Sequence, residues 1–177
     1  KGIYDFISAA EIISQTQYSD LILFRLIGEP DLENPNSVLP EEWDSWRQSG
    51  IVDCLGFRDD VSKLFSETNI VVLPSYYGEG LPKVLIEAAA CGRAVITTDS
   101  PGCRDAVLDG ETGIIIPVKD PLALSQAILK FAKNRPLATK MGKAGRKFAK
   151  ITFSIDSVVS LHLEIYKSVL DSSNHYL

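Results

Sequence analysis

Two carboxylates in one short segment, Glu79 and Glu87, are the residues of this sequence best placed for ligand chemistry. The segment spans residues 74–87 and joins an apolar strand to a helix-forming run. Two glycines flank Glu79 and allow a ligand to approach the backbone closely. Pro82 suits the first turn of a helix, where a missing N–H group costs no internal hydrogen bond. The free N–H groups of this helix start, with the helix dipole, predict an anion site that suits a phosphate.

Glu87 is the only polar side chain between Val84 and Cys91, so we expect it in a buried helix. Burying a polar group without a partner costs roughly 2–7 kcal/mol. A pair of ribose hydroxyls would satisfy this carboxylate, because both of its oxygens accept hydrogen bonds. The alternatives are a salt bridge to Lys83 or contact with water. For Glu79, favourable placement near the helix dipole is an equal alternative to binding.

The elements that must position these residues alternate between short apolar strands and helices. Strands are predicted at 21–27, 51–55, 70–73, 94–98 and 114–116. Helices are predicted at 3–13, 40–48, from Asp59 or Asp60 to 68, and at 81–91, 104–108, 121–134, 140–150 and 154–170. This alternation predicts an α/β fold with a doubly wound parallel sheet. Such sheets bind ligands beyond the carboxyl ends of their strands, which is where residues 74–87 begin.

Length and composition favour one compact domain over residues 1–177, with 154–177 as a C-terminal helix and tail. The 177 residues are 45% hydrophobic and carry a net charge of −5, which disfavours nucleic acid as a partner. Cys54, Cys91 and Cys103 follow no metal or redox spacing and indicate reduced, cytosolic thiols. No apolar run approaches the roughly 20 residues that span a bilayer.

Several short motifs, taken in order, resemble the retaining GT-B nucleotide-sugar glycosyltransferases of family four. Residues 79–87 match the E-x7-E signature of that family. The other matching segments are Lys1-Gly2, 55–60, 72–75, 89–92 and 109–113. The resemblance runs from residue 1 to about 166 and implies the Rossmann-like C-terminal half of a GT-B fold. We therefore expect a donor-binding domain whose acceptor-binding partner domain precedes residue 1.

The same resemblance assigns roles to the two glutamates and to the start of the chain. It places Glu87 on the ribose hydroxyls and Glu79 on hydroxyls of the donor sugar. Lys1 matches a lysine that neutralises the diphosphate together with an upstream arginine. Glu79 and Lys1 are therefore the catalytic candidates. The backbone of residues 80–83, that is Gly80, Leu81, Pro82 and Lys83, is expected near the sugar and the diphosphate.

Two further segments bear on the donor. Phe57 and Arg58 stand where family members hold the base, for which we expect uracil; packing for Phe57 and surface exposure or capping of Asp59 for Arg58 are equal alternatives. Residues 101–105 depart from the Gly-Gly-x-x-Glu pattern of many members. This version looks like a subgroup that builds surface polysaccharides or lipopolysaccharides on lipid carriers, often from N-acetylhexosamine donors.

The resemblance implies a cytoplasmic retaining glycosyltransferase, peripheral to the inner face of the membrane, that moves a sugar from a UDP-sugar to a glycan or lipid-linked acceptor. We expect no cofactor and no metal, because no suitable Asp-x-Asp loop occurs, so positive groups must stabilise the leaving diphosphate. The isolated chain is expected to transfer no sugar. The alternatives are a non-hydrolysing sugar-nucleotide epimerase-like protein and a non-catalytic nucleotide-binding domain. A dinucleotide oxidoreductase is disfavoured, since the Gly-x-Gly-x-x-Gly turn is missing.

The remaining polar and aromatic candidates have simpler interpretations. Residues 140–150 form a basic segment, which is either a solvated face or an aid to approaching an anionic membrane. His162 and His175 lie away from acidic or cysteine clusters, so metal binding is disfavoured. Trp43 and Trp46 have the spacing of packing residues on one helix face.

Overall fold

Parallel strands carry the fold in the computed structural model, which describes residues 2–31, 33–34, 36–78 and 80–173. Within that part of the chain, one sheet pairs β1 with β2 and another has the order β3-β4-β5. The strands are β1 (Phe24–Ile27), β2 (Val52–Gly56), β3 (Ile70–Leu73), β4 (Ala94–Thr98) and β5 (Gly113–Ile116). Both sheets are parallel throughout, which confirms the predicted fold class. The sequence predicted one sheet, whereas the described strands form two, because neither β1 nor β2 pairs with a strand of the other sheet.

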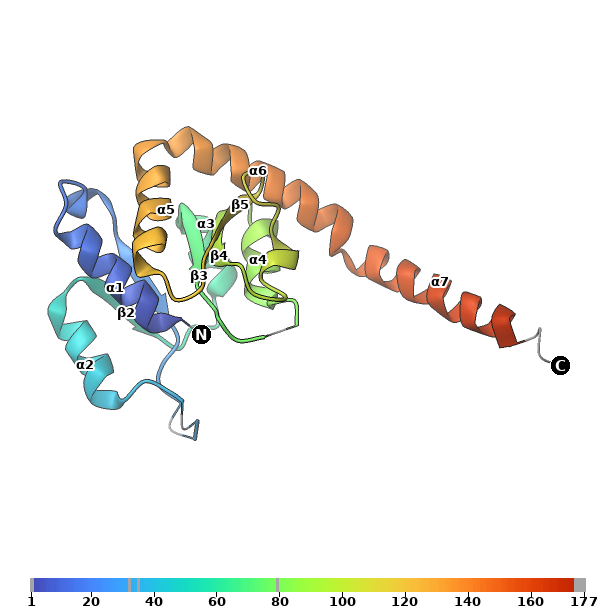
Figure 1. Ribbon diagram of the computed structural model, residues 1–177, viewed down its shortest axis with the longest axis horizontal. Helices are drawn as coiled ribbons and strands as arrows, with labels where there is room; N and C mark the ends of the chain where they lie inside the picture. The colour runs from blue at the N-terminus through green and yellow to red at the C-terminus, as the bar shows by residue number, and fades with distance from the viewer. Residues whose placement is uncertain (1, 32, 35, 79, 174–177) are drawn as a thin grey trace.

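Helices alternate with these strands and then close the chain (Figure 1). They are α1 (Ile3–Ser14), α2 (Pro40–Ser49), α3 (Val61–Glu67), α4 (Lys83–Ala90), α5 (Pro121–Lys133), α6 (Arg135–Thr152) and α7 (Ile155–Ser173), with short 3-10 turns at Ser19–Leu21 and Arg104–Ala106. The first of these turns includes Leu21, so β1 starts at Phe24 and not at the predicted residue 21.

Helix α6 starts at Arg135, earlier than the predicted residue 140, because the local sequence provides a complete helix start. The Asn134 side chain accepts a hydrogen bond from the backbone N–H of Leu137 at 3.2 Å. Pro136 lies in the first turn, where proline is tolerated. The Asn-x-Pro sequence therefore joins α5 to α6 with a sharp bend.

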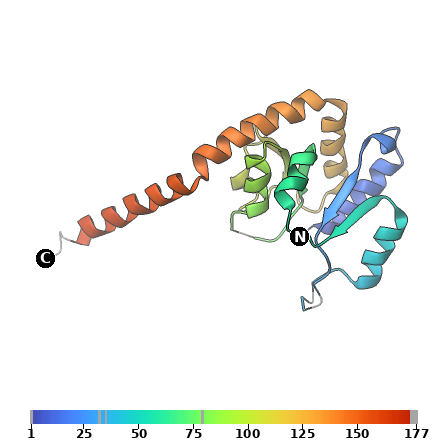
Figure 2. The same cartoon turned by 180° about the vertical axis from the view of Figure 1, so that it is seen from behind.

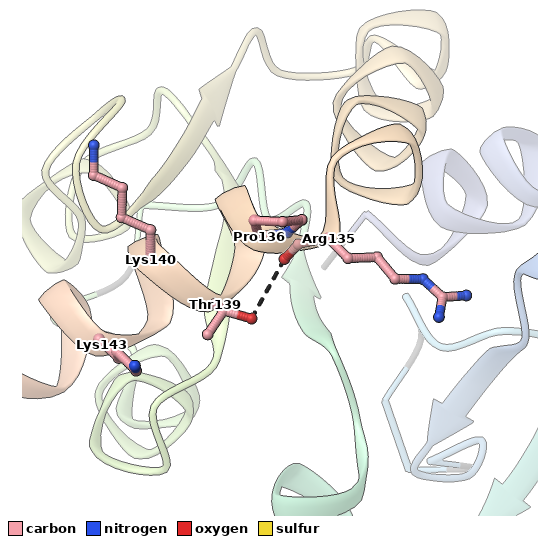
Figure 3. Close-up of a pocket in the computed structure, with 5 residues that line it drawn as sticks. All are labelled: Arg135, Pro136, Thr139, Lys140 and Lys143. Carbon is pink, nitrogen blue, oxygen red and sulfur yellow. Dashed lines mark hydrogen bonds between the residues drawn. The ribbon is translucent and has the colours of Figure 1, made fainter.

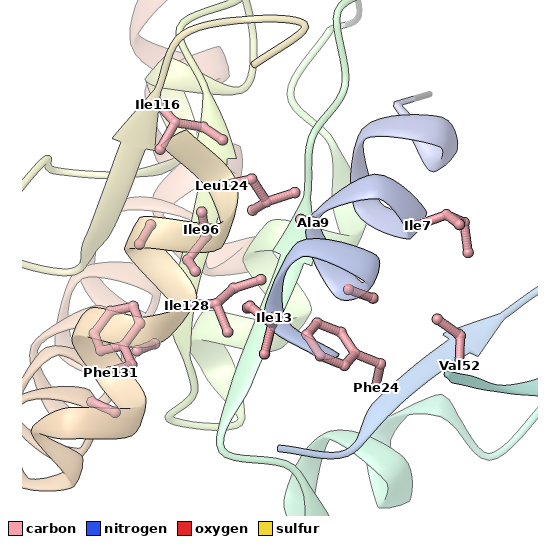
Figure 4. Close-up of a cluster of buried hydrophobic side chains, with 14 of the residues drawn as sticks. Ile7, Ala9, Ile13, Phe24, Val52, Ile96, Ile116, Leu124, Ile128 and Phe131 are labelled. Atoms are coloured by element: carbon pink, nitrogen blue, oxygen red, sulfur yellow. The ribbon is translucent and has the colours of Figure 1, made fainter. Parts of the chain in front are cut away.

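Strand β4 is buried along its whole length because helices cover both of its faces. Ala94 and Ile96 belong to a cluster of buried side chains that includes residues of α1 and α5. Val95 points to the other side and packs in a second cluster with residues of α3 and α4. Figure 4 shows the first cluster, in which Phe24 of β1 meets side chains of α1 and α5. The first cluster therefore joins the two sheets, which share no strand pairing in the described part of the chain.

Helix α7 projects from this body and packs on little of it (Figures 1 and 2). Its large apolar side chains are exposed, including Ile155 at 81% and Leu170 at 65%. The aromatic pair Phe148 and Phe153, with ring centroids 5.2 Å apart, closes the end of α6 before α7 begins. No helix in the described ranges combines the length and the apolar character needed to cross a bilayer.

Candidate functional site

The carboxyl ends of β3 and β4 are tied together by buried hydroxyl groups. Thr97 Oγ1 donates to the Leu73 carbonyl at 2.8 Å. The Thr98 hydroxyl donates to the Ser75 carbonyl, and Ser100 Oγ donates to the same oxygen at 3.2 Å. These bonds fix the point where the chain leaves β3 and enters the predicted ligand segment. Our sequence reasoning missed them, although two threonines at the end of an apolar strand were an available signal.

The first turn of α1 is packed against the same strand end through Gly2. Gly2 has a φ of 74°, in the left-handed region that favours glycine. Any side chain at Gly2 would collide with the carbonyl oxygen of Pro74, which directly follows β3. The start of α1 and the end of β3 are therefore in direct contact, as the placement of Lys1-Gly2 near the ligand segment requires. Lys1 itself lies outside the described residues.

The backbone predicted to face the diphosphate, residues 80–83, lies on an open loop and at the start of α4. Pro82 is the residue preceding the helix, which begins at Lys83 and not at the predicted residue 81. The Leu85 N–H donates to the Pro82 carbonyl at 3.1 Å. Gly80 has open space where a side chain would stand, and Leu81 is 40% exposed. The segment is thus accessible to a ligand.

Glu87 does not lie in a buried helix, so that part of the prediction was wrong. Its side chain is 45% exposed, and its Oε1 lies 3.3 Å from the Nζ of Lys83. Helix α4 buries only Leu85, Ala88 and Ala89, because one of its faces is open. The salt bridge is the alternative that the sequence left open. A pair this exposed contributes little, about 0–1 kcal/mol, and can be exchanged for a ligand at low cost.

Glu79 also lies outside the described residues. Its assignment to the donor sugar, like that of Lys1 to the diphosphate, stays a prediction. The described neighbours Gly78 and Gly80 both have room for a side chain. No other part of the described protein therefore blocks a ligand from approaching the backbone at these two glycines.

Phe57 and Arg58 follow β2. Phe57 is 75% exposed, so the packing alternative for this ring is wrong. Arg58 makes a bidentate pair with Asp60 at 2.8 and 2.7 Å, which lowers the pKa of the Asp60 carboxyl. The partner is Asp60 and not Asp59. The Phe57 ring is thus open to a ligand, while the Arg58 guanidinium is already paired.

A set of polar and aromatic residues near the start of α1 was not predicted from the sequence. Asp5 Oδ2 is buried without a hydrogen-bond partner in the described structure. Burial raises the pKa of Asp5, while the nearby Lys119 opposes that shift. The Lys119 ammonium lies 5.0 Å from the centre of the Tyr76 ring. Burial also raises the pKa of Tyr76, and Tyr77 adds to the shift. These residues join α1 to the ends of β3 and β5.

The loop of residues 101–105 is held by its own side chains. Asp105 Oδ2 accepts a hydrogen bond from the Gly102 N–H at 3.0 Å. Arg104 lies 3.1 Å from the Asp99 carboxylate, directly after β4. Cys103 is fully buried. The part of the chain that the structure describes holds no group of three or more His, Cys, Asp or Glu side chains suited to a metal.

Comparisons with known proteins place this geometry in context. The sequence profile described as "Glycosyl transferases group 1" matches residues 1–148. A Campylobacter jejuni protein named N,N'-diacetylbacillosaminyl-diphospho-undecaprenol alpha-1,3-N-acetylgalactosaminyltransferase is 31% identical over 170 residues, covering 96% of this chain and 42% of that protein. The capsular polysaccharide biosynthesis glycosyltransferase CapM of Staphylococcus aureus is 31% identical over 173 residues, covering 98% and 44%.

A solved structure of Anabaena HepE in complex with UDP has a TM-score of 0.80 to this chain at 20% identity, covering 97% of this chain and 45% of that one. At this identity the likeness concerns the fold alone. The chain spans less than half the length of these relatives.

Proposed function

The chain belongs to the glycosyl transferases group 1 family, and from that membership we propose that it is the donor-binding part of a retaining glycosyltransferase that uses a UDP-sugar. One observation carries the proposal: the start of α1 contacts the end of β3, and the loop that leaves this end of β3 leads directly into the start of α4. Helix starts at a carboxyl edge favour a bound diphosphate. The UDP in the HepE structure supports the choice of nucleotide.

In this proposal, the residues at that edge bind different parts of the donor. Glu87 exchanges its exposed Lys83 partner for the two ribose hydroxyls. The backbone of residues 80–83 faces the sugar and diphosphate, and Phe57 and Arg58 lie beside the base. Glu79 and Lys1 act on the donor sugar and the diphosphate.

Departure of the nucleotide diphosphate leaves negative charge on its oxygens. Fixed positive groups and helix N–H groups that face this charge lower the barrier without any proton transfer. Lys1 and the first turn of α4 supply such groups in our proposal, with an arginine from the preceding part of the full protein. We propose no metal or other cofactor for this step. The sugar keeps its anomeric configuration in the product.

The acceptor is proposed to be a glycan or lipid-linked sugar of surface polysaccharide synthesis, with a UDP-N-acetylhexosamine as candidate donor. The names of the Campylobacter and Staphylococcus relatives, which refer to an undecaprenol-linked acceptor and to capsular polysaccharide, support this class. Because the chain spans under half of those relatives, we expect the 177-residue chain to bind donor without transferring sugar.

Titration calorimetry with UDP, GDP and ADP tests the donor site. We expect UDP to bind best, and Glu87→Ala to weaken it at least about tenfold, since a charged group that pairs with ligand hydroxyls is lost. Glu111→Ala is the matched control, because Glu111 is exposed and lies in the turn before β5. Equal UDP affinity of Glu87→Ala and the parent would contradict the site. Failure to bind any of the three nucleotides would contradict the proposed donor site as well.

A further inference from the structure

Helix α6 carries an unbroken cationic surface that the proposed donor site does not use. The helix contains no Asp or Glu between residues 135 and 152. Its positive side chains are all exposed: Arg135, Lys140, Lys143, Arg146, Lys147 and Lys150. We call this set the α6 cationic face. It stands out because the chain as a whole has a net charge of −5.

The helical repeat gathers these cations on one side. At 3.6 residues per turn, all six side chains fall within an arc of about 140°. From Arg135 to Lys150 the arc extends roughly 22 Å along the helix. The opposite side buries Ala138, Met141, Gly142, Gly145 and Ala149. The α6 cationic face is therefore a convex strip on a helix whose other side is packed into the core.

None of the ion pairs found among the described residues uses a side chain of α6. Those pairs join Arg25 to Asp53, Arg58 to Asp60, Lys83 to Glu87 and Arg104 to Asp99. The charges of the α6 cationic face are thus not neutralised by carboxylates of the described chain. An external anion is the partner that their concentration on one face favours.

The first part of the strip borders a hollow of about 600 Å³. Arg135, Pro136, Thr139, Lys140 and Lys143 line it. Figure 3 shows Arg135 extending to one side of Thr139 while Lys140 and Lys143 lie on the other. The Thr139 hydroxyl donates to the Arg135 carbonyl at 3.4 Å. The charged ends of these three side chains point in different directions, so they face separate anionic groups and not one shared group.

We propose that the α6 cationic face is a docking surface for a bilayer containing anionic phospholipids. The number of cations falls within the range of about 4–8 that membrane-binding basic segments use. The strip ends beside two exposed apolar side chains, Ile151 at 62% and Ile155 at 81% exposure. Cations bordered by apolar side chains match the lipid headgroup region, which lies over hydrocarbon.

The shape of the face disfavours nucleic acid as its partner. A single convex helix provides no groove for a strand, and the aromatic side chain of α6, Phe148, packs on Phe153 and is not part of the cationic face. The acidic chain as a whole also repels a long polyanion. A planar anionic surface touches the strip alone and avoids the acidic remainder.

Docking at this face leaves the candidate donor site open. Gly142 of α6 packs so closely on the Gly92 carbonyl that a side chain there would collide with it. Gly92 precedes β4, so α6 crosses near the amino end of that strand. The candidate site lies at the carboxyl ends of β3 and β4, beyond the opposite end of β4. Lipid binding and UDP binding should therefore be independent.

Vesicle flotation with the 177-residue chain tests the proposal. We expect at least about tenfold more bound protein on phosphatidylcholine vesicles containing about 30% phosphatidylglycerol than on pure phosphatidylcholine. Raising the salt from about 0.05 M to about 0.5 M should release it, because salt screens exposed charges. Equal binding to both vesicle types would overturn the proposal, and so would binding that persists at high salt.

Matched double variants separate the face from bulk charge. Lys140→Glu with Lys147→Glu should reduce binding about tenfold, and Arg47→Glu with Lys63→Glu should not. All four residues are exposed, and both variants replace two positive charges by two negative ones. An equal effect of the two double variants would overturn the assignment to α6.

Two further measurements test whether the variant is folded and whether the face binds nucleic acid instead of lipid. Circular dichroism checks folding, and if the glutamate variant unfolds, Lys140→Gln with Lys147→Gln must still weaken binding. Added single-stranded RNA should not release the protein from vesicles. Release by RNA at equal phosphate concentration would assign the face to nucleic acid and overturn the proposal.

Discussion

At the scale of single residues, the edge of the sheet combines a contact that only glycine allows with a buried carboxylate oxygen that lacks a hydrogen bond in the described structure. Gly2 is required where its backbone meets Pro74, and Asp5 follows within the first turn of α1. A carboxylate in this turn is favoured by the helix dipole, but its Oδ2 has lost water without gaining a hydrogen bond in the described structure. Lys119 offsets part of that cost.

Asp5 predicts a specific pH dependence of stability. Its pKa is raised in the folded chain, so between the unfolded and folded pKa values the folded state binds more protons. Unfolding free energy therefore falls as pH rises from about 4 through the folded pKa. Asp5→Asn removes this term. We expect the Tm of the variant relative to the parent to increase as pH goes from about 4 to about 7.

Differential scanning calorimetry at several pH values measures this difference. The control must be an aspartate that holds no structural hydrogen bond. This excludes Asp109, because its Oδ1 accepts a hydrogen bond from the Ile115 N–H. Asp44→Asn on the exposed side of α2 is suitable. A Tm difference between Asp5→Asn and the parent that does not change with pH would contradict the prediction.

At the scale of elements, the hydroxyl groups at the end of β4 determine where the ligand segment leaves β3. Thr97, Thr98 and Ser100 are buried and donate to the carbonyls of Leu73 and Ser75 at the end of β3. A parallel sheet has no turn at this position to fix the outgoing chain. Side-chain hydrogen bonds replace it, and α4 then starts at a defined place.

Thr98→Val should loosen this segment. The change keeps the shape of the side chain but removes one of the two buried donors to the Ser75 carbonyl, at a cost of about 0.5–1.5 kcal/mol in unfolding free energy. We also expect UDP affinity to fall several-fold, because the proposed binding backbone is less well positioned. Chemical denaturation and calorimetry measure the two effects.

The control is Ser125→Ala, which also removes a buried hydroxyl, one that donates to the Leu122 carbonyl within α5. It should lose stability and keep UDP affinity. If both variants weaken UDP binding equally, the effect reflects overall stability and not the segment after β3.

At the scale of the whole molecule, the chain consists of a packed α/β body and the projecting helix α7 (Figure 1). The body has a continuous core that includes residues of both sheets. The side chains of α7 are exposed along nearly its whole described length. Exposed helices with few packed contacts unfold locally before the body does.

Ending the chain after Ser154 should therefore leave the body intact. We expect its Tm to change by less than about 3 °C, because α7 buries little apolar surface. The Phe148–Phe153 contact stays in place in this shortened chain. Scanning calorimetry of the two chains measures the change. A Tm lower by roughly 8 °C or more would show that α7 stabilises the body.

The sequence alone determined the order of the elements and the family. Short continuous apolar runs such as 70–73 and 94–96 predict buried strands, because they lack a polar face for water and are too short for a buried helix. The helix boundaries were less exact, since Pro82 precedes α4 instead of lying in its first turn, and α6 starts at Arg135 and not at the predicted residue 140. The segment of residues 79–87 was recognisable because its residue types and spacing are both read directly from the chain.

The tertiary structure decided what depends on distant neighbours. The prediction that Glu87 is buried was wrong. The helical repeat shows which residues share a face of a helix, but it does not show whether another element covers that face. Three other features were also missed: the split into two sheets, the collision that requires glycine at position 2, and the hydroxyl groups that donate to Ser75. Each of them involves residues about 25 to 70 positions apart in the sequence. Contacts of that separation are set by packing, which no local pattern encodes.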